Sequence, residues 1–110
     1  MKRIVFFRVG WMDKYDGEEQ DVIVGGGKFV HEEGWGYEMF NFRPHQGRLY
    51  GHVETGKKSP SSDYGTRSIK LERIGSEEDR HADFLEDVTV VWVARHPKGA
   101  GTRVVGWYKN

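Results

Sequence analysis

Val88-Thr89-Val90-Val91-Trp92-Val93-Ala94 is the most strand-like stretch of this chain of 110 residues. β-Branched and aromatic residues fill the stretch, and such residues favour extended backbone. The run is apolar enough for a strand that is covered on both sides, so we expect it at the centre of a sheet. Trp92, in the middle of the valines, is therefore expected to be a core residue.

Shorter runs of β-forming residues occur on both sides of this central stretch. Glycine or charged residues bound them, as is typical of strands in small β domains. These runs span residues 4–11, 22–24, 28–30, 68–74 and 102–108.

A hairpin is predicted between residues 37–43 and 48–54. The sequence Pro44-His45-Gln46-Gly47 joins the two arms, and proline first with glycine last suits a type I turn. Alternation along the arms gives the hairpin two faces. The apolar face, expected to be core, carries Phe40, Phe42, Leu49, Gly51 and Val53. The opposite face carries rings, an amide and cations: Tyr37, Met39, Asn41, Arg43, Arg48, Tyr50 and His52.

These elements together predict a mainly β domain of the α+β type. Ser76, followed by three acidic residues, predicts the N-cap of one short helix, with Ala82, Phe84 and Leu85 on its buried side. We expect a small, strongly bent sheet or a partly open β-barrel of about six or seven strands, because glycines permit sharp bends and closure removes strand edges. Residues 1–110 form a single domain by size.

Composition narrows the function classes. The chain has four Trp, five Tyr, six Phe and 15 Gly, but no Cys, which excludes disulfides, thiolate zinc sites and cysteine nucleophiles. It has no signal peptide and no run of about 18 apolar residues that would span a membrane, so we expect a cytoplasmic protein without a membrane partner.

Charge is balanced overall but segregated along the chain. The 17 basic and 17 acidic residues cancel, which argues against strong nonspecific binding to nucleic acid. Acidic residues gather in 13–33 and 77–87, whereas 43–73 is mainly basic. The basic part could face a polyanion, or the whole could be a mixed, solvated surface.

Catalytic and metal-binding patterns are weak. Gly25-Gly26-Gly27-Lys28 lacks the spacing of a phosphate-binding loop, and the five His show no metal-ligand spacing. His52, with Tyr50 and Glu54, could do acid–base chemistry, so a small hydrolase or nuclease stays an alternative. We expect no catalytic residue, no metal and no cofactor in this domain.

Aromatic side chains beside glycines suggest a pocket for a planar ligand such as a nucleobase. Trp35 has glycine on both sides and is the candidate for a mobile lid over a base. An amide could read a base edge, and cations could hold phosphates. The predicted base-binding residues are Trp11, Trp35, Tyr37, Asn41, Tyr50 and Trp107. The predicted phosphate-binding residues are Lys28, Arg43, Arg48, Lys57, Lys58 and Arg67.

Several motifs resemble the N-terminal domain found ahead of HNH-type nuclease modules in bacterial, modification-dependent, restriction-like endonucleases. The motifs are Gly10-Trp11-Met12, residues 25–30, residues 36–42, residues 47–51, residues 69–75, residues 90–94 and residues 104–110. That domain is similar to the PUA-like superfamily, which includes the EVE, YTH and SRA readers of modified bases.

The resemblance implies a bent β-barrel that binds DNA and reads a flipped, modified base in an aromatic cage. It implies that cleavage belongs to a separate nuclease module in the same chain, so that residues 1–110 are a candidate fragment of a longer nuclease. A protein-interaction domain that uses the same aromatic face stays the other alternative.

Overall fold

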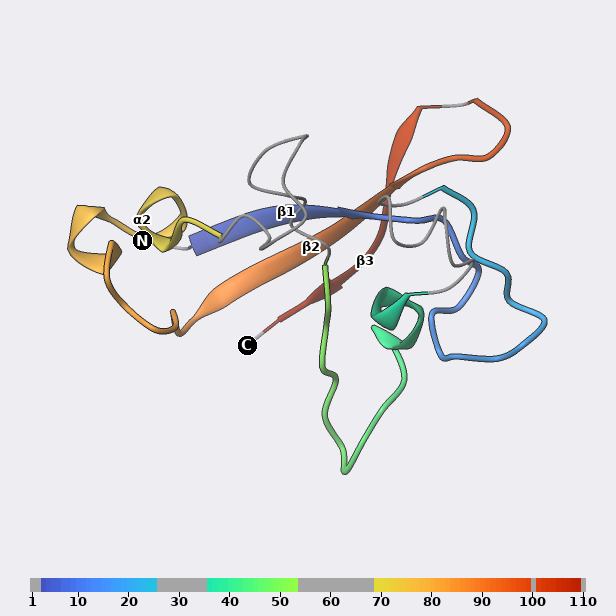
Figure 1. Ribbon diagram of the computed structural model, residues 1–110, viewed down its shortest axis with the longest axis horizontal. Helices are drawn as coiled ribbons and strands as arrows, with labels where there is room; N and C mark the ends of the chain where they lie inside the picture. The colour runs from blue at the N-terminus through green and yellow to red at the C-terminus, as the bar shows by residue number, and fades with distance from the viewer. Residues whose placement is uncertain (1–2, 26–35, 54–68, 100, 110) are drawn as a thin grey trace, which may run out of the picture.

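The computed structural model describes residues 3–25, 36–53, 69–99 and 101–109 (Figure 1). Three strands form one sheet: β1 (Arg3–Val9), β2 (Val88–Arg95) and β3 (Thr102–Tyr108). Short helical turns complete the elements: the 3₁₀ turns η1 (Tyr37–Phe40) and η2 (Glu77–Asp79), and the helix α2 (Leu71–Ile74).

β2 is the central strand, as its sequence predicts. It pairs in parallel with β1 and antiparallel with β3, in the order β1-β2-β3. The register places Phe6 beside Val91 and Val91 beside Trp107, so these three residues form one row across the sheet. A parallel pair needs a long crossover, and here most of the chain lies between β1 and β2.

The predicted barrel of six or seven strands is wrong, because the described residues form an open, mixed sheet of three strands. Of the strand predictions, 4–11, the central stretch and 102–108 correspond to β1, β2 and β3. Residues 22–24 contribute only an isolated bridge, between Val24 and Trp11. Residues 28–30 lie outside the described part of the chain.

The predicted hairpin over 37–54 is wrong as well. Its first arm begins with η1, in which the Asn41 N–H donates to the Glu38 carbonyl at 3.1 Å, and its loop is closed by the isolated bridge between His45 and Arg48. Side chains three apart lie on the same side of a 3₁₀ turn, whereas a strand would send them to opposite faces. The turn therefore buries Glu38 and Asn41 together.

The helical prediction near Ser76 is confirmed only in part. The Ser76 N–H donates to the Asp79 carboxylate at 2.8 Å at the start of η2, which fits an N-cap position. The turn is short, and the predicted buried side is wrong for Ala82 and Phe84, which are exposed, whereas Leu85 is half-buried. The predicted strand over 68–74 contains α2 instead.

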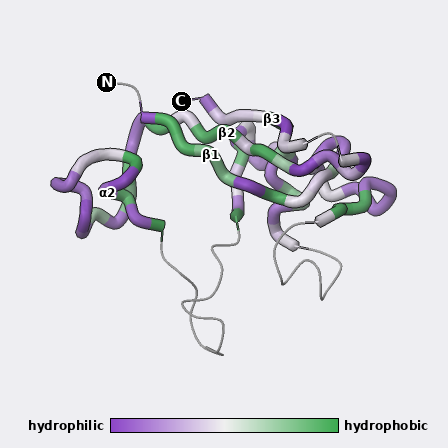
Figure 2. Tube along the Cα trace, turned by 90° about the horizontal axis from the view of Figure 1, so that it is seen from above, coloured by the Kyte–Doolittle hydropathy of each residue, from purple (hydrophilic) through white to green (hydrophobic). Residues whose placement is uncertain are grey.

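The core lies on one side of the sheet. Trp92 is buried there, as predicted, and packs with Val9, Ala94 and side chains from the segment between Met12 and Ile23. Phe42 lies against Gly106 of β3, which closes the core from the segment after η1. Figure 2 shows the three strands together along one side of the molecule.

Gly106 provides a test of this packing. A Cβ at this position would collide with the Phe42 ring, so Gly106→Ala should lower the free energy of unfolding by about 1–3 kcal/mol through overpacking. Because Phe42→Leu removes the clashing ring atoms, the double variant should lose clearly less stability than the sum of the two single losses. Urea unfolding of all four proteins measures this coupling, and strict additivity would show that the two residues do not touch.

Candidate nucleic-acid interface

Exposed rings and cations gather in residues 37–52, which we call the ring segment. Tyr37 and Tyr50 each expose 61% of their surface. Each phenol ring lies edge-on to an imidazole: Tyr37 to His52, with centroids 5.5 Å apart, and Tyr50 to His45, at 6.3 Å. Such edge contacts favour these ring positions while much of each phenol stays in contact with solvent.

The charge of the ring segment is positive. Residues 39–53 contain no Asp or Glu, and the only acid of the segment, Glu38, is buried. Arg43 and Arg48 are exposed, and no carboxylate of a described residue pairs with either guanidinium. Arg43 lies over the Phe40 ring, 5.9 Å from its centroid. Both guanidinium groups can therefore meet a phosphate.

Asn41 fixes the shape of the ring segment. Its amide, which is fully buried, accepts a hydrogen bond from the His52 N–H at 2.8 Å and donates one to the His52 carbonyl at 3.2 Å. The Asn41 carbonyl accepts a hydrogen bond from the Tyr108 hydroxyl. The amide thus takes the place of a neighbouring strand for His52 and ties the segment to β3.

Glu38 and Tyr15 anchor the other end of the segment. The Glu38 carboxylate accepts a hydrogen bond from the Gly10 N–H at 2.9 Å, and the Tyr15 hydroxyl donates to the Gly10 carbonyl at 2.5 Å. The Tyr15 carbonyl accepts from the Phe42 N–H at 2.8 Å. Burial raises the pKa of Tyr15 to about 12, so its hydroxyl remains a donor at neutral pH.

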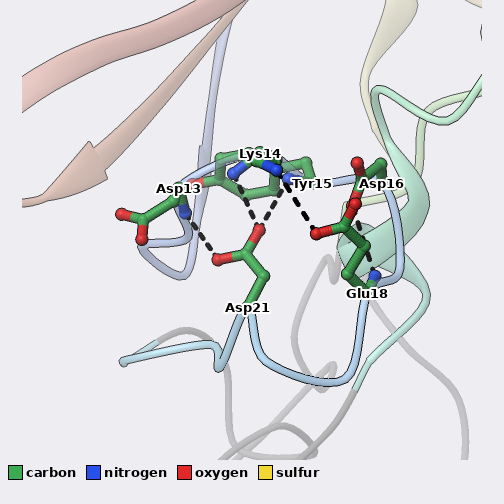
Figure 3. A network of polar contacts seen from close by, with 6 residues as sticks. All are labelled: Asp13, Lys14, Tyr15, Asp16, Glu18 and Asp21. Carbon is green, nitrogen blue, oxygen red and sulfur yellow. Dashed lines mark hydrogen bonds and ion pairs between the residues drawn. The ribbon is translucent and has the colours of Figure 1, made fainter.

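Asp21 holds the loop that presents Tyr15 (Figure 3). Its carboxylate accepts hydrogen bonds from the N–H groups of Asp13 and Lys14, both at 2.7 Å, and of Tyr15, at 3.1 Å. Burial acts to raise the pKa of Asp21, but the three N–H donors outweigh burial and hold this pKa below its ordinary value. A charged, buried carboxylate thus organises a loop that has no regular secondary structure.

The structure does not bring all the predicted base-binding rings together. Tyr37 and Tyr50 belong to the ring segment, whereas Trp107 is 62% exposed on the side of the sheet opposite the core. Trp11 is half-buried against His96, with ring centroids 4.8 Å apart. A single cage lined by all these rings is therefore not formed.

The remaining predicted residues have three different outcomes. The Asn41 amide, predicted to read a base edge, is occupied by the backbone of His52. Arg43 and Arg48, predicted to hold phosphates, lie in the ring segment. Trp35, Lys28, Lys57, Lys58 and Arg67 lie outside the described residues, as does Glu54 of the alternative acid–base group.

Sequence reasoning missed the residues that support the segment. Asp21, Glu38 and Tyr15 stand in polar or alternating stretches that indicate a solvated loop or a strand surface. The sequence did contain one signal that this loop matters: Tyr15 and Gly17 closely follow Gly10-Trp11-Met12, one of the motifs that carry the family resemblance. Nothing in the sequence shows which acids are buried.

Two further observations concern the described residues alone. None of their His, Asp and Glu side chains form a group of three or more that could hold a metal ion. Likewise, no helix within 3–25, 36–53, 69–99 or 101–109 has both the length and the apolar character needed to cross a membrane.

In comparisons with known proteins, no family model, no curated protein and no solved structure matches this chain. The resemblance to nuclease-associated domains therefore stays a prediction that depends on the sequence motifs.

Asp21→Asn should destabilise the fold in a pH-dependent way. A carboxyl group with a lowered pKa stabilises the fold above its unfolded pKa, and this contribution is lost as pH falls through the folded pKa. In the variant, the NH₂ group of the new amide would oppose at least one backbone N–H, so we expect a loss of about 1–3 kcal/mol at neutral pH. Urea unfolding from neutral pH to about pH 3 should show the two proteins converging in acid. Asp13→Asn, at an exposed carboxylate, is the matched control, and a pH-independent difference would contradict the role of Asp21.

Asn41→Ala should lower stability by about 1–3 kcal/mol, because the N–H and carbonyl of His52 lose their partner. Thermal unfolding measures the loss. If Asn41→Ala instead kept full stability and lost only affinity for DNA, the amide would read a base rather than hold the backbone.

Proposed function

We propose that this chain is a DNA-binding module in which the ring segment stacks on a flipped, modified base. Tyr37 and Tyr50 supply the stacking surfaces, and Arg43 and Arg48 hold the flanking phosphates. In this proposal the domain itself does not cleave DNA. It directs a nuclease module in the same chain to the DNA that the domain binds. The observation that carries the proposal is that one segment, held at both ends by hydrogen bonds, presents exposed rings and two guanidinium groups with which no carboxylate of a described residue pairs.

The energetics are adequate for such a site. Stacking a base on one aromatic side chain is worth roughly 1–3 kcal/mol, and extruding a base from a duplex costs a few kcal/mol. Two phenols and two guanidinium groups can together offset that cost. A methyl group on the base would add roughly 0.8 kcal/mol when it is buried, which gives a modest preference for a modified base.

Rigidity supports the proposal as well. A flexible loop would lose conformational entropy on binding, whereas the hydrogen bonds of Asn41 and Glu38 already fix both ends of the ring segment. The neutral net charge of the chain limits nonspecific attraction, so binding should depend on this local surface rather than on the whole molecule.

Fluorescence anisotropy tests the proposal with labelled duplexes that contain cytosine, 5-methylcytosine, 5-hydroxymethylcytosine or N6-methyladenine. Matched single-stranded DNA and RNA complete the set. We expect salt-sensitive binding to at least one duplex, with tighter binding when a modified base is present. Failure to bind any of these probes at low salt would overturn the proposal.

Tyr50→Ala should weaken binding roughly 5- to 150-fold, the equivalent of one lost stack, without changing the thermal unfolding temperature. Val22→Ala, at an apolar residue that is 66% exposed outside the ring segment, is the control and should bind like the wild type. Arg48→Gln should weaken binding to all duplexes and reduce the salt slope by about one. Equal losses in the Tyr50 and Val22 variants would show that the ring segment is not the contact surface.

A further inference from the structure

The side of the sheet that faces away from the core is apolar and open to solvent. We call it the outer sheet face, made by Ile4, Phe6, Val91, Val93, Val104 and Trp107. Phe6 is 64% exposed and Trp107 is 62% exposed, on either side of Val91. Figure 2 shows the backbone of the three strands along one side of the molecule. Exposed apolar patches of this kind mark interaction surfaces in soluble proteins.

Cations border the outer sheet face at one end. Arg8 neighbours Val93 in the register, and its guanidinium donates a hydrogen bond across the sheet to the Thr102 hydroxyl at 3.2 Å. Arg95 is exposed beside Thr102. The three strands contain no Asp or Glu. Aromatic residues and Arg are enriched in protein–protein contacts, and aliphatic side chains between the rings suit a protein better than a stack of bases.

A partner surface that binds the outer sheet face must present both apolar and acidic groups. Two copies that met through the outer sheet face alone would offer Arg8 and Arg95 no acidic partner, because the three strands contain no Asp or Glu. Residues 77–87 of the chain itself have the required character. Phe84 is 70% exposed there, among exposed acidic residues. Those acidic residues are Glu77, Glu78, Asp83, Glu86 and Asp87, of which Glu77 pairs with Arg80 of the same segment.

We propose that the outer sheet face binds residues 77–87 of a second copy of this chain. Within one molecule the two surfaces do not cover each other, because Phe84 and Trp107 are both exposed. The chain has zero net charge, but each copy carries both a cationic and an acidic surface. In this arrangement the cationic surface of one copy faces the acidic surface of the other. The ring segment lies on the core side of the sheet and takes no part in the contact.

Sedimentation velocity on the purified protein without nucleic acid tests the proposal. We expect the sedimentation coefficient to rise with protein concentration at low salt and to rise less at high salt. Trp107→Ser should weaken the association by roughly tenfold or more, as expected for a central aromatic contact. A monomer at every concentration and salt level would overturn the proposal.

Charge reversal gives a sharper test. One variant carries Arg8→Glu and Arg95→Glu, and a second carries Asp83→Lys and Glu86→Lys. Each variant alone should associate more weakly than the wild type, because the first turns the cations of the outer sheet face into anions and the second places two lysines beside Phe84, opposite Arg8 and Arg95. An equimolar mixture should associate again, because the first variant's face then meets the second variant's lysines. Circular dichroism and thermal unfolding confirm that each variant is folded.

The results of these experiments distinguish a contact between the outer sheet face and residues 77–87 from binding of nucleic acid by either surface. If the mixture stays monomeric while the wild type associates, the acidic segment is not the partner and the proposal fails. If the wild type is monomeric and the Arg8 and Arg95 variant loses affinity for DNA, the outer sheet face binds nucleic acid instead. DNA binding by the ring segment is measured separately through Tyr50→Ala, so either proposal can fail without the other.

Discussion

The buried amide of Asn41 is the interaction on which the rest of the described structure depends. It pairs with both backbone groups of His52, and the carbonyl of the same residue accepts the Tyr108 hydroxyl. Through the next residue, Phe42, the segment is also bonded to the Tyr15 carbonyl. One short stretch therefore joins the loop after β1, the ring segment and β3, three regions that are far apart in the sequence.

This arrangement explains how a chain with few leucines and isoleucines organises long irregular segments. The core cluster is small, and the buried Asn41 amide and Glu38 carboxylate beside it bond backbone groups, whereas the Trp92 Nε1 in the core has no hydrogen-bond partner among the described residues. Glu38, Asp21 and Tyr15 each bond backbone groups that no neighbouring strand satisfies. Buried networks of this kind specify one conformation because every alternative leaves a polar group without a partner.

The sequence predicted what depends on local composition. The apolar run at β2 and the β-branched ends of the chain are strands, and Trp92 is a core residue. Prediction from the sequence failed where a tertiary contact determines the local conformation. The alternation in residues 37–43 has the period of a strand, yet burial of Glu38 and Asn41 on one side requires a turn. No local pattern indicates that an amide 11 residues before His52 will bond its backbone.

The sheet separates two surfaces of different character. The core side supports the ring segment, whose phenols and guanidinium groups are polar at their edges and suit bases and phosphates. The opposite side presents aliphatic and aromatic groups with Arg8 and Arg95 at one border, which suit a partner that is both apolar and acidic. Trp92 and Trp107 lie on neighbouring strands but on opposite sides of the sheet, so the first is buried and the second is exposed. Because the side-chain period of a strand is two, this division follows from the register alone. A slip of one residue between β2 and β3 would bury Trp107 and expose Tyr108, and it would break the bond that Tyr108 makes to Asn41. The register of the sheet and the position of the ring segment are thus set by the same contact.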